Sequence, residues 1–332
     1  MSRHRTLPAC AAALFTAFLS LPQTTAAQNW APTRPVELVV AVSPGGGIDR
    51  MARSIQKIIQ DYKLVEQPVS VVNKPGGAST IAQVYLHHRA GDAHTIEIAA
   101  TSLLTNHIIG RSPFDHTAFT PIAMLSDEYI GFLVRADSLF RNGKDLIGQF
   151  KSNPVVLPIG IATAAGNTNH IAAALVAKAA GADVKKLKIV VFGSGGESTT
   201  ALLGGHVGLV TTPSANGIPH LQAGRMRMLG VAAPKRLEGA LSVVPTWKEQ
   251  GVNAVVANWR PVIAPRGLTP AQIRYWEEVF AKVVQTAEWK TEVEASGAVS
   301  NFMRSRELAA HFAAEQKRFR VTLTELGMAQ PQ

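Results

Sequence analysis

Cysteine is nearly absent from this sequence, because its 332 residues contain only Cys10. Cys10 lies in a leader in which Arg3 and Arg5 precede an apolar stretch at residues 7–21, and small residues end with Ala27. This pattern is typical of a cleavable secretory signal. We therefore predict that residues 1–27 are removed and that the mature chain is exported. It would then contain no disulfide, thiolate metal site or thiol nucleophile.

Two other interpretations of the leader are less favoured. Its apolar stretch is shorter than the ~20 residues that a membrane-spanning helix needs, and it ends at Pro22. Cys10 precedes the apolar core of the leader instead of following it, which is the wrong order for a lipidation site. Export without an anchor is therefore the prediction.

Acidic residues and aromatic residues are both scarce. Asp and Glu number 23 against 33 Lys and Arg, and aromatic residues make up 6% of the chain. The basic residues are scattered, the longest cluster being Lys185-Lys186-Leu187-Lys188, and few aromatics lie among them to stack on bases. We predict no nucleic-acid partner. The positive charge is instead expected to raise the local concentration of acidic solutes.

Signatures of common enzyme classes are also missing. The sequence contains no Gly-x-Ser-x-Gly nucleophile elbow, no phosphate loop ending in Gly-Lys-Ser/Thr and no complete Gly-x-Gly-x-x-Gly fingerprint before a helix. His87, His88, His94 and His107 lie close together but lack a recognisable metal-ligand spacing. The sequence therefore predicts no cofactor, no metal site and no catalysis, with an enzyme as the competing class.

Three glycine-rich turns stand out among the features that are present. Ser43-Pro44-Gly45-Gly46-Gly47-Ile48-Asp49 follows an apolar run, and related turns occur at Asn73-Lys74-Pro75-Gly76-Gly77-Ala78-Ser79 and Phe192-Gly193-Ser194-Gly195-Gly196-Glu197-Ser198. Each leads into a helical pattern. Glycines let backbone amides point at a ligand, and a helix start adds partial positive charge, so such turns suit a carboxylate or phosphate. Three of them predict a cleft that holds anions.

Short apolar runs alternate with helical stretches, which is the α/β pattern. Strands are expected at residues 36–42, 69–72, 95–100, 122–125, 129–134, 159–161, 188–192, 207–210 and 228–232. Helices are expected at residues 48–60, 80–88, 144–150, 168–180, 198–203, 270–286, 290–296 and 305–326, with a short turn near Leu103. The length of the mature chain suits two domains of ordinary size.

A resemblance to a known family rests on several short segments. They are Arg34-Pro35-Val36-Glu37-Leu38-Val39-Val40, Pro44-Gly45-Gly46-Gly47-Ile48-Asp49, Asn73-Lys74-Pro75-Gly76-Gly77, Leu202-Leu203-Gly204-Gly205-His206-Val207, Ala223-Gly224-Arg225-Met226-Arg227 and Val244-Pro245-Thr246. Their order and spacing resemble those of the Bug-type periplasmic solute receptors of tripartite tricarboxylate transporters. Asn258-Trp259-Arg260, Tyr275-Trp276 and Glu288-Trp289-Lys290 are similar to the branch associated with citrate-like ligands.

The resemblance implies a two-lobed α/β binding protein of the type II, Venus-flytrap kind, in which each lobe is a sheet flanked by helices. The first lobe would comprise residues 28–125 and 228–332, and the second residues 126–227, with crossings near residues 125–129 and 227–230. It further implies a periplasmic monomer that binds a di- or tricarboxylate and delivers it to membrane subunits of the transporter. A receptor that signals to a membrane sensor and a periplasmic hydrolase remain as alternatives.

The resemblance also implies which residues bind the ligand. Carried over to this sequence, they are Pro44, Gly45, Gly46, Gly47, Ile48, Asp49, Gly77, Ala78, Ser102, Thr163, Thr168, Asn169, His170, Gly195, Gly196 and Arg260. The free amides at residues 168–170 and the Thr168 hydroxyl are expected to donate to an anion because they begin a helix.

Three of these residues have a structural alternative. Asp49 is expected to act as a first-turn acid or cap of its helix, because a carboxylate beside an anionic ligand would repel it. His170 is expected to be packed or to cap a helix. Arg260 could bind a ligand carboxylate with its planar fork, or it could form an ion pair with Asp127 or Glu128.

The sequence also departs from the family pattern at a few positions. Pro261 stands where a small residue is common, Gly208 where an acid is often found, and Ala164-Ala165 where the cleft loop is more often polar or glycine. The wall of the second lobe is thus less polar than usual, which permits a longer or partly apolar acid.

Overall fold

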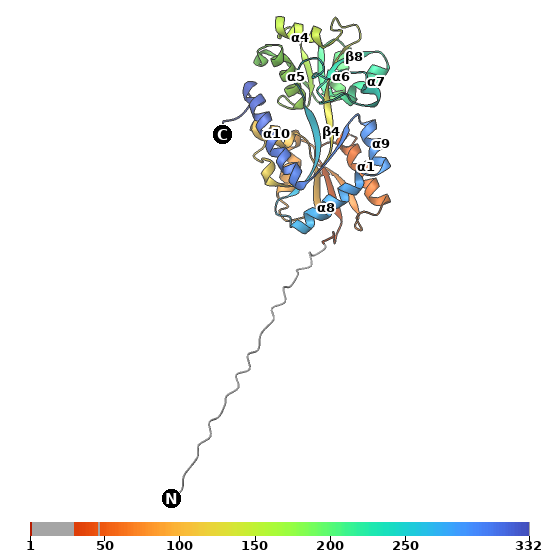
Figure 1. Cartoon of the computed structure of the whole chain (residues 1–332), viewed down its shortest axis with the longest axis vertical. Coiled ribbons are helices and arrows are strands. Elements are labelled where there is room, and N and C mark those ends of the chain that lie inside the picture. Colours follow the sequence, from red (N-terminus) through yellow and green to blue (C-terminus); the bar gives the residue numbers. More distant parts are fainter. Residues whose placement is uncertain (2–29, 46, 332) are drawn as a thin grey trace.

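The computed structural model describes Met1, residues 30–45 and residues 47–331. The leader predicted at residues 1–27 therefore lies outside the described residues, except for Met1, and so does Gly46. Figure 1 shows two lobes, with β4 (Phe119–Arg135) running through both of them. Within the described part of the chain, no helix combines the length and the apolar character that crossing a membrane requires.

The first sheet lies in the lower lobe of Figure 1. β1 (Val36–Val40) pairs in parallel with β2 (Val69–Asn73) and β3 (Thr95–Ile98). β9 (Ala257–Pro265) runs antiparallel between β3 and β4, and β10 (Val299–Arg304) pairs with the other edge of β4. This sheet therefore contains strands from both ends of the described chain.

Helices cover both faces of the first sheet. One face packs against α1 (Gly47–Asp61), α8 (Pro270–Val283) and α9 (Ala287–Ala295), whose Ile55, Trp276 and Trp289 are fully buried. The remaining helices of this lobe are α2 (Thr80–His87), α3 (Ser102–Ile108) and α10 (Ser305–Glu325), and they contribute to a core that continues into the second lobe. Tight packing of apolar side chains on both faces of the sheet is the main source of stability here.

The second sheet has the order β8 (Met226–Val231), β4, β7 (Leu209–Pro213), β5 (Ile159–Ala162) and β6 (Ile189–Phe192). Its helices are α4 (Gly143–Ser152), α5 (Thr168–Ala179), α6 (Gly195–Leu203) and α7 (Ile218–Gln222). Short 3₁₀ turns occur at Gly77–Ser79, His116–Ala118, Val184–Lys186, Ser214–Gly217 and Gly239–Leu241.

Two expectations from the sequence were wrong in detail, and two strands were missed. The runs at 122–125 and 129–134 are one strand, because Asp127 and Glu128 between them bond to Asn301 and Arg260 and so stay in the sheet. The turn near Leu103 is the helix α3. Strands β9 and β10 were missed, since β9 carries polar residues and Pro261, which a register shift in its pairing with β4 accommodates.

The chain also returns to the first lobe later than the sequence suggested. The expected crossing near residues 227–230 falls inside β8, which pairs with residues 131–135 of β4 in the second sheet. Trp247 then packs against Phe132 of that same sheet, with ring centroids 4.8 Å apart. The first sheet is re-entered only at β9. The apolar run at 228–232 does not indicate which sheet it joins, because β4 belongs to both sheets and could pair with it in either one.

Candidate functional site

A cavity of about 550 Å³ lies where the two lobes face each other. Its described lining residues are Gly77, Ala78 and Arg111 from the first lobe and Thr163, Ala164, Ala165 and Val191 from the second. Five of these lining residues were singled out in the sequence, namely Gly77 and Ala78 in a glycine turn, Thr163 as an expected ligand-binding residue, and Ala164 and Ala165 in the cleft loop. The cavity is large enough for a small organic ligand with several waters.

The first-lobe wall is a strained loop. Gly76, Gly77, Ala78 and Ser79 have φ angles of 114°, 57°, 52° and 87°, so four consecutive residues adopt positive φ. Asn106 holds this loop, since its Nδ2 donates to the Ala78 carbonyl at 2.6 Å, and Ser102 Oγ donates to Ser79 Oγ at 3.1 Å. Strained backbone that is held by its surroundings is typical of ligand-binding loops.

A matching strained position lies in the second-lobe wall. Thr163 has φ 65°, and its hydroxyl accepts a hydrogen bond from Asn167 Nδ2 at 3.1 Å. Among the described residues other than glycine, positive φ occurs only at Lys63, Ala78, Ser79 and Thr163. Two of these four, Ala78 and Thr163, line opposite walls of one cavity, and Ser79 directly follows Ala78, which is the strongest geometric indication of a binding site.

The start of α5 differs from the expectation that its amides are free donors. Asn167 caps this helix, and its side-chain oxygen accepts from the amides of Asn169 and His170 at 3.1 and 3.2 Å. Thr168, Asn169 and His170 are all buried. The cap could not be foreseen from the spacing alone, because Asn167 and Thr168 are both common N-cap residues.

His170 is packed inside the second lobe. Its Nδ1 accepts a hydrogen bond from the Gly166 amide at 3.1 Å, which ties the cleft loop to α5. Burial lowers the pKa of the imidazole to about 4, so the ring is neutral at physiological pH. These contacts match the packed role that the sequence favoured for this histidine.

Asp49 faces its own helix start. Its carboxylate accepts hydrogen bonds from the Gly45 amide at 2.8 Å, from Arg53 at 3.0 and 3.1 Å, and from Asn73 Nδ2 at 2.8 Å. The bond from Arg53 is the main cause that lowers the pKa of this buried carboxyl to about 2. Asp49 thus fixes the exposed turn at Pro44 and Gly45, while Gly47 and Ile48 begin α1.

The third glycine turn begins α6. Ser194 Oγ accepts from the Glu197 amide at 3.1 Å, and the Glu197 carboxylate accepts from the Gly193 amide at 3.0 Å. Gly195 and Gly196 form the first residues of the helix. A Cβ at Gly195 would lie 2.4 Å from Asn216 Nδ2, so a larger residue there would displace the Asn216 side chain from its hydrogen bond to Thr212.

Arg260 lies on β9 and is absent from the described lining of the cavity. Its Nη2 and Nε donate to the Glu128 carboxylate at 2.6 and 3.2 Å, and 6% of the residue is exposed. Of the two roles that the sequence left open, the structure contains the ion pair. Nothing in the sequence could choose between the roles, because the pairing depends on β9 lying beside β4.

Arg111 is a lining residue that sequence reasoning missed. Its Nη1 donates to the Ala165 carbonyl at 2.9 Å, so this first-lobe side chain reaches a second-lobe loop. The nearby Gly166 is close to Ile109 and to Met328 of the C-terminal tail. Arg111 belongs to none of the family-like segments, and its role depends on the meeting of the two lobes.

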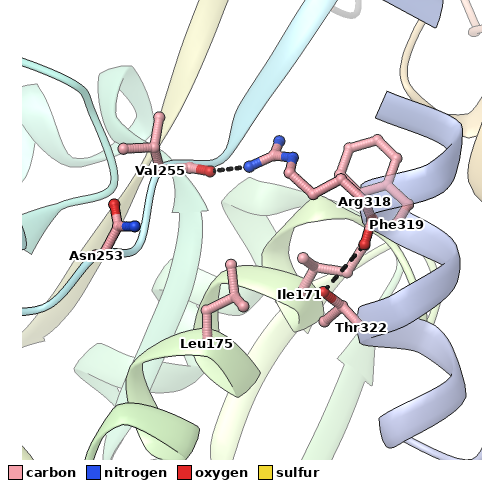
Figure 2. Close-up of a pocket in the computed structure, with 7 residues that line it drawn as sticks. All are labelled: Ile171, Leu175, Asn253, Val255, Arg318, Phe319 and Thr322. Carbon is pink, nitrogen blue, oxygen red and sulfur yellow. Dashed lines mark hydrogen bonds between the residues drawn. The ribbon is translucent and has the colours of Figure 1, made fainter. Parts of the chain in front are cut away.

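A smaller cavity of about 160 Å³ lies at a joint between the lobes. Figure 2 shows Ile171 and Leu175 of α5 facing Arg318, Phe319 and Thr322 of α10, with Asn253 and Val255 alongside. Arg318 donates to the Val255 carbonyl and to Glu315, which lies one turn before it on α10. This cavity belongs to the joint, because four of its seven lining residues are apolar (Ile171, Leu175, Val255 and Phe319) and its cation, Arg318, already has partners.

The described residues contain no group of three or more His, Cys, Asp or Glu side chains arranged to hold a metal ion.

Comparisons with known proteins agree with this geometry. The model of the tripartite tricarboxylate transporter family receptor matches residues 51–328. A Cupriavidus necator protein, described as the UPF0065 protein in the gbd 5' region, is 26% identical over 91% of this chain and 90% of its own length.

Two solved structures share the fold. The R. palustris protein Rpa4515, solved with adipate, has a TM-score of 0.78 and 26% identity, and the match covers 90% of this chain and 99% of that one. The periplasmic binding protein BugD has a TM-score of 0.76 and 22% identity, with 90% and 100% covered. The two-lobed fold expected from the sequence is thereby confirmed.

Proposed function

The chain belongs to the tripartite tricarboxylate transporter receptor family, which is made up of solute-binding receptors and not of enzymes, and we propose that it binds a small carboxylated anion between its lobes. We further propose that it is periplasmic and delivers this ligand to the membrane subunits of such a transporter. The observation that carries the proposal is the cavity whose two walls, one from each lobe, are both built on strained backbone.

The chemistry of the cavity supports an anionic ligand. Arg111 supplies a permanent positive charge, and no acidic side chain is among its described lining residues. Backbone amides in left-handed segments can converge on a carboxylate oxygen. The adipate bound to the R. palustris protein is a further support, since it places a dicarboxylate in a protein with this fold.

Binding of this kind is expected to involve lobe closure. β4 and β9 pass between the lobes or lie at their boundary, so they can act as a hinge while each sheet stays intact. The citrate-like ligand expected from the sequence is one candidate, and shorter or longer di- and tricarboxylates are the others.

A thermal-shift screen tests the proposal. The mature protein is unfolded, dialysed and refolded to remove any trapped ligand, and then mixed with mono-, di- and tricarboxylates, amino acids and neutral sugars. We expect one class of carboxylate to raise the melting temperature, because a ligand that binds only the folded state stabilises it. Small-angle scattering with that acid should give a smaller radius of gyration. Stabilisation by sugars or amino acids alone would contradict the proposal.

A further inference from the structure

The two lobes contribute different kinds of side chain to the cavity between them. Arg111 is the single charged side chain among the described lining residues, and it lies in the first lobe. The second-lobe wall contributes Ala164, Ala165 and Val191, which offer methyl groups, and Val191 keeps 47% of its surface exposed. A fully polar ligand such as a hydroxylated tricarboxylate would leave these methyl groups against its polar atoms.

The partner of Arg111 is a weak one. Its Nη1 donates to a neutral carbonyl, that of Ala165, at 2.9 Å. A guanidinium can instead make two parallel hydrogen bonds to a carboxylate, and charge-assisted bonds of that kind are about twice as strong as neutral ones. The side chain is also exposed, so a ligand can reach its remaining N–H groups without displacing a buried contact.

The strained loop at Gly77 and Ala78 provides a separate place for another carboxylate. The loop of Gly77 and Ala78 has left-handed backbone on the first-lobe side of the cavity. Across from it, the Thr163 amide donates to the Phe192 carbonyl at 2.8 Å and the Ala164 amide donates to the Ala162 carbonyl at 2.9 Å, so the amides of Gly77 and Ala78 are the ones assigned to the ligand. Neither loop segment contributes a charged side chain to the lining. Two kinds of anion-binding group, backbone amides and one guanidinium, therefore share a cavity whose remaining described walls are largely aliphatic.

We propose that Arg111 is a specificity-determining residue that binds the second carboxylate of an aliphatic α,ω-dicarboxylate. The first carboxylate lies against the amides of Gly77 and Ala78, the methylene chain packs against Ala164 and Val191, and the second carboxylate replaces the Ala165 carbonyl as the partner of Arg111. This inference rests on the proposed receptor function and narrows its ligand class.

Pairs of acids with the same carbon chain measure how much the second carboxylate contributes to the affinity. Hexanoate and adipate have the same carbon chain and differ in the second carboxylate, as do octanoate and suberate. Isothermal titration of the refolded protein gives an affinity for each acid. We expect each dicarboxylate to bind at least tenfold more tightly than its monocarboxylate partner, because only the dicarboxylate engages Arg111.

Substitution of Arg111 then tests the assignment. Arg111→Ala should reduce dicarboxylate affinity at least tenfold and leave monocarboxylate affinity within about twofold, so that the preference disappears. Arg111→Lys should keep part of the preference, since it retains the charge but not the fork. Arg274→Ala is the matched control, because Arg274 is exposed on α8 and does not line the cavity.

The ratio of the two affinities distinguishes this role from a structural one. If Arg111→Ala weakens mono- and dicarboxylates equally, Arg111 acts on lobe closure or on the first carboxylate, and the proposal is wrong. An unchanged preference would overturn it as well. If citrate or another acid binds tightly while both aliphatic series fail, the receptor function stands and this inference falls. Failure of every acid tested would reject both.

Discussion

Arg260 and Glu128 form a buried ion pair between the neighbouring strands β9 and β4, with 2.6 Å between Nη2 and the carboxylate. The pair lies close to Tyr129 and Ile130, where β4 exchanges β9 for β7 as its partner. Its side chains are 7% and 15% exposed, so removal of one partner leaves a poorly solvated charge.

We therefore predict that Arg260→Ala lowers the free energy of unfolding by about 3 kcal/mol. Urea titration measures this loss, with Arg274→Ala as the surface control. The double variant Arg260→Met with Glu128→Leu should lose less than Arg260→Ala, because no unpaired charge remains. If Arg260→Ala leaves stability unchanged and abolishes carboxylate binding, Arg260 is a ligand-binding residue after all.

His170 should make the protein less stable in mild acid. Burial lowers its pKa to about 4 in the folded state, whereas the exposed imidazole of the unfolded chain has an ordinary value near 6.5. As the pH falls from 6.5 to 4, the unfolded chain takes up a proton that the folded chain does not, so stability is lost across this window. The full loss corresponds to about 3 kcal/mol.

His170→Gln checks this expectation, because glutamine can still accept from the Gly166 amide but does not titrate. Unfolding free energies at pH 7.5, 6, 5 and 4 should fall less steeply in this variant than in the wild type. His88→Gln, an exposed substitution, should keep the wild-type slope. Parallel slopes for wild type and His170→Gln would refute the assignment.

Glu97 should make the protein less stable as the pH rises, which is the opposite of the effect expected for His170. It is buried in β3, one of its carboxyl oxygens has no hydrogen-bond partner, and burial raises its pKa to about 8. Between pH 4.5 and pH 8 the unfolded chain releases this proton and the folded chain keeps it, so the contribution of Glu97 to stability falls as the pH rises. The slope is at most about 1.4 kcal/mol per pH unit.

Comparison of wild type with Glu97→Gln isolates this effect. The variant should gain stability relative to the wild type as the pH rises from 5 to 8, whatever its absolute stability. Glu294→Gln, at an exposed position on α9, serves as the control. A difference between Glu97→Gln and wild type that does not vary with pH would show that Glu97 ionises normally.

Two glycines should respond oppositely to alanine. Gly76 has φ 114°, and a Cβ there would lie 2.6 Å from Ile81 Cδ1. Gly76→Ala should therefore destabilise the protein by about 2 kcal/mol and weaken carboxylate binding through the adjoining loop. Gly148 lies within α4 with nothing within 4 Å of its Cβ position, so Gly148→Ala should stabilise by about 0.5–1 kcal/mol. Calorimetric melting of both variants measures the contrast, and equal effects would contradict it.

Local signals in the sequence located most elements of the first lobe and the main helices. Periodicity placed α1, α2 and α5 to within a few residues, because each has its own apolar face and start signal. The same signals failed for β9, because its Asn258 and Arg260 break the apolar pattern. Both side chains donate to the Glu128 carboxylate on the neighbouring strand β4. They also did not show that β8 belongs to the second sheet, because the residues of a strand do not reveal which strand it pairs with.

By itself, the sequence determined the α/β class, the positions of the glycine turns and the family, because each depends on residues that are neighbours along the chain. The tertiary structure alone decided that Arg260 pairs with Glu128, that Asn167 occupies the amides of α5, and that Arg111 reaches the opposite lobe. Each of these contacts depends on the relative placement of strands, loops or lobes. Composition and periodicity carry no information about that placement, because the chain segments are brought together only by the packing of the whole fold.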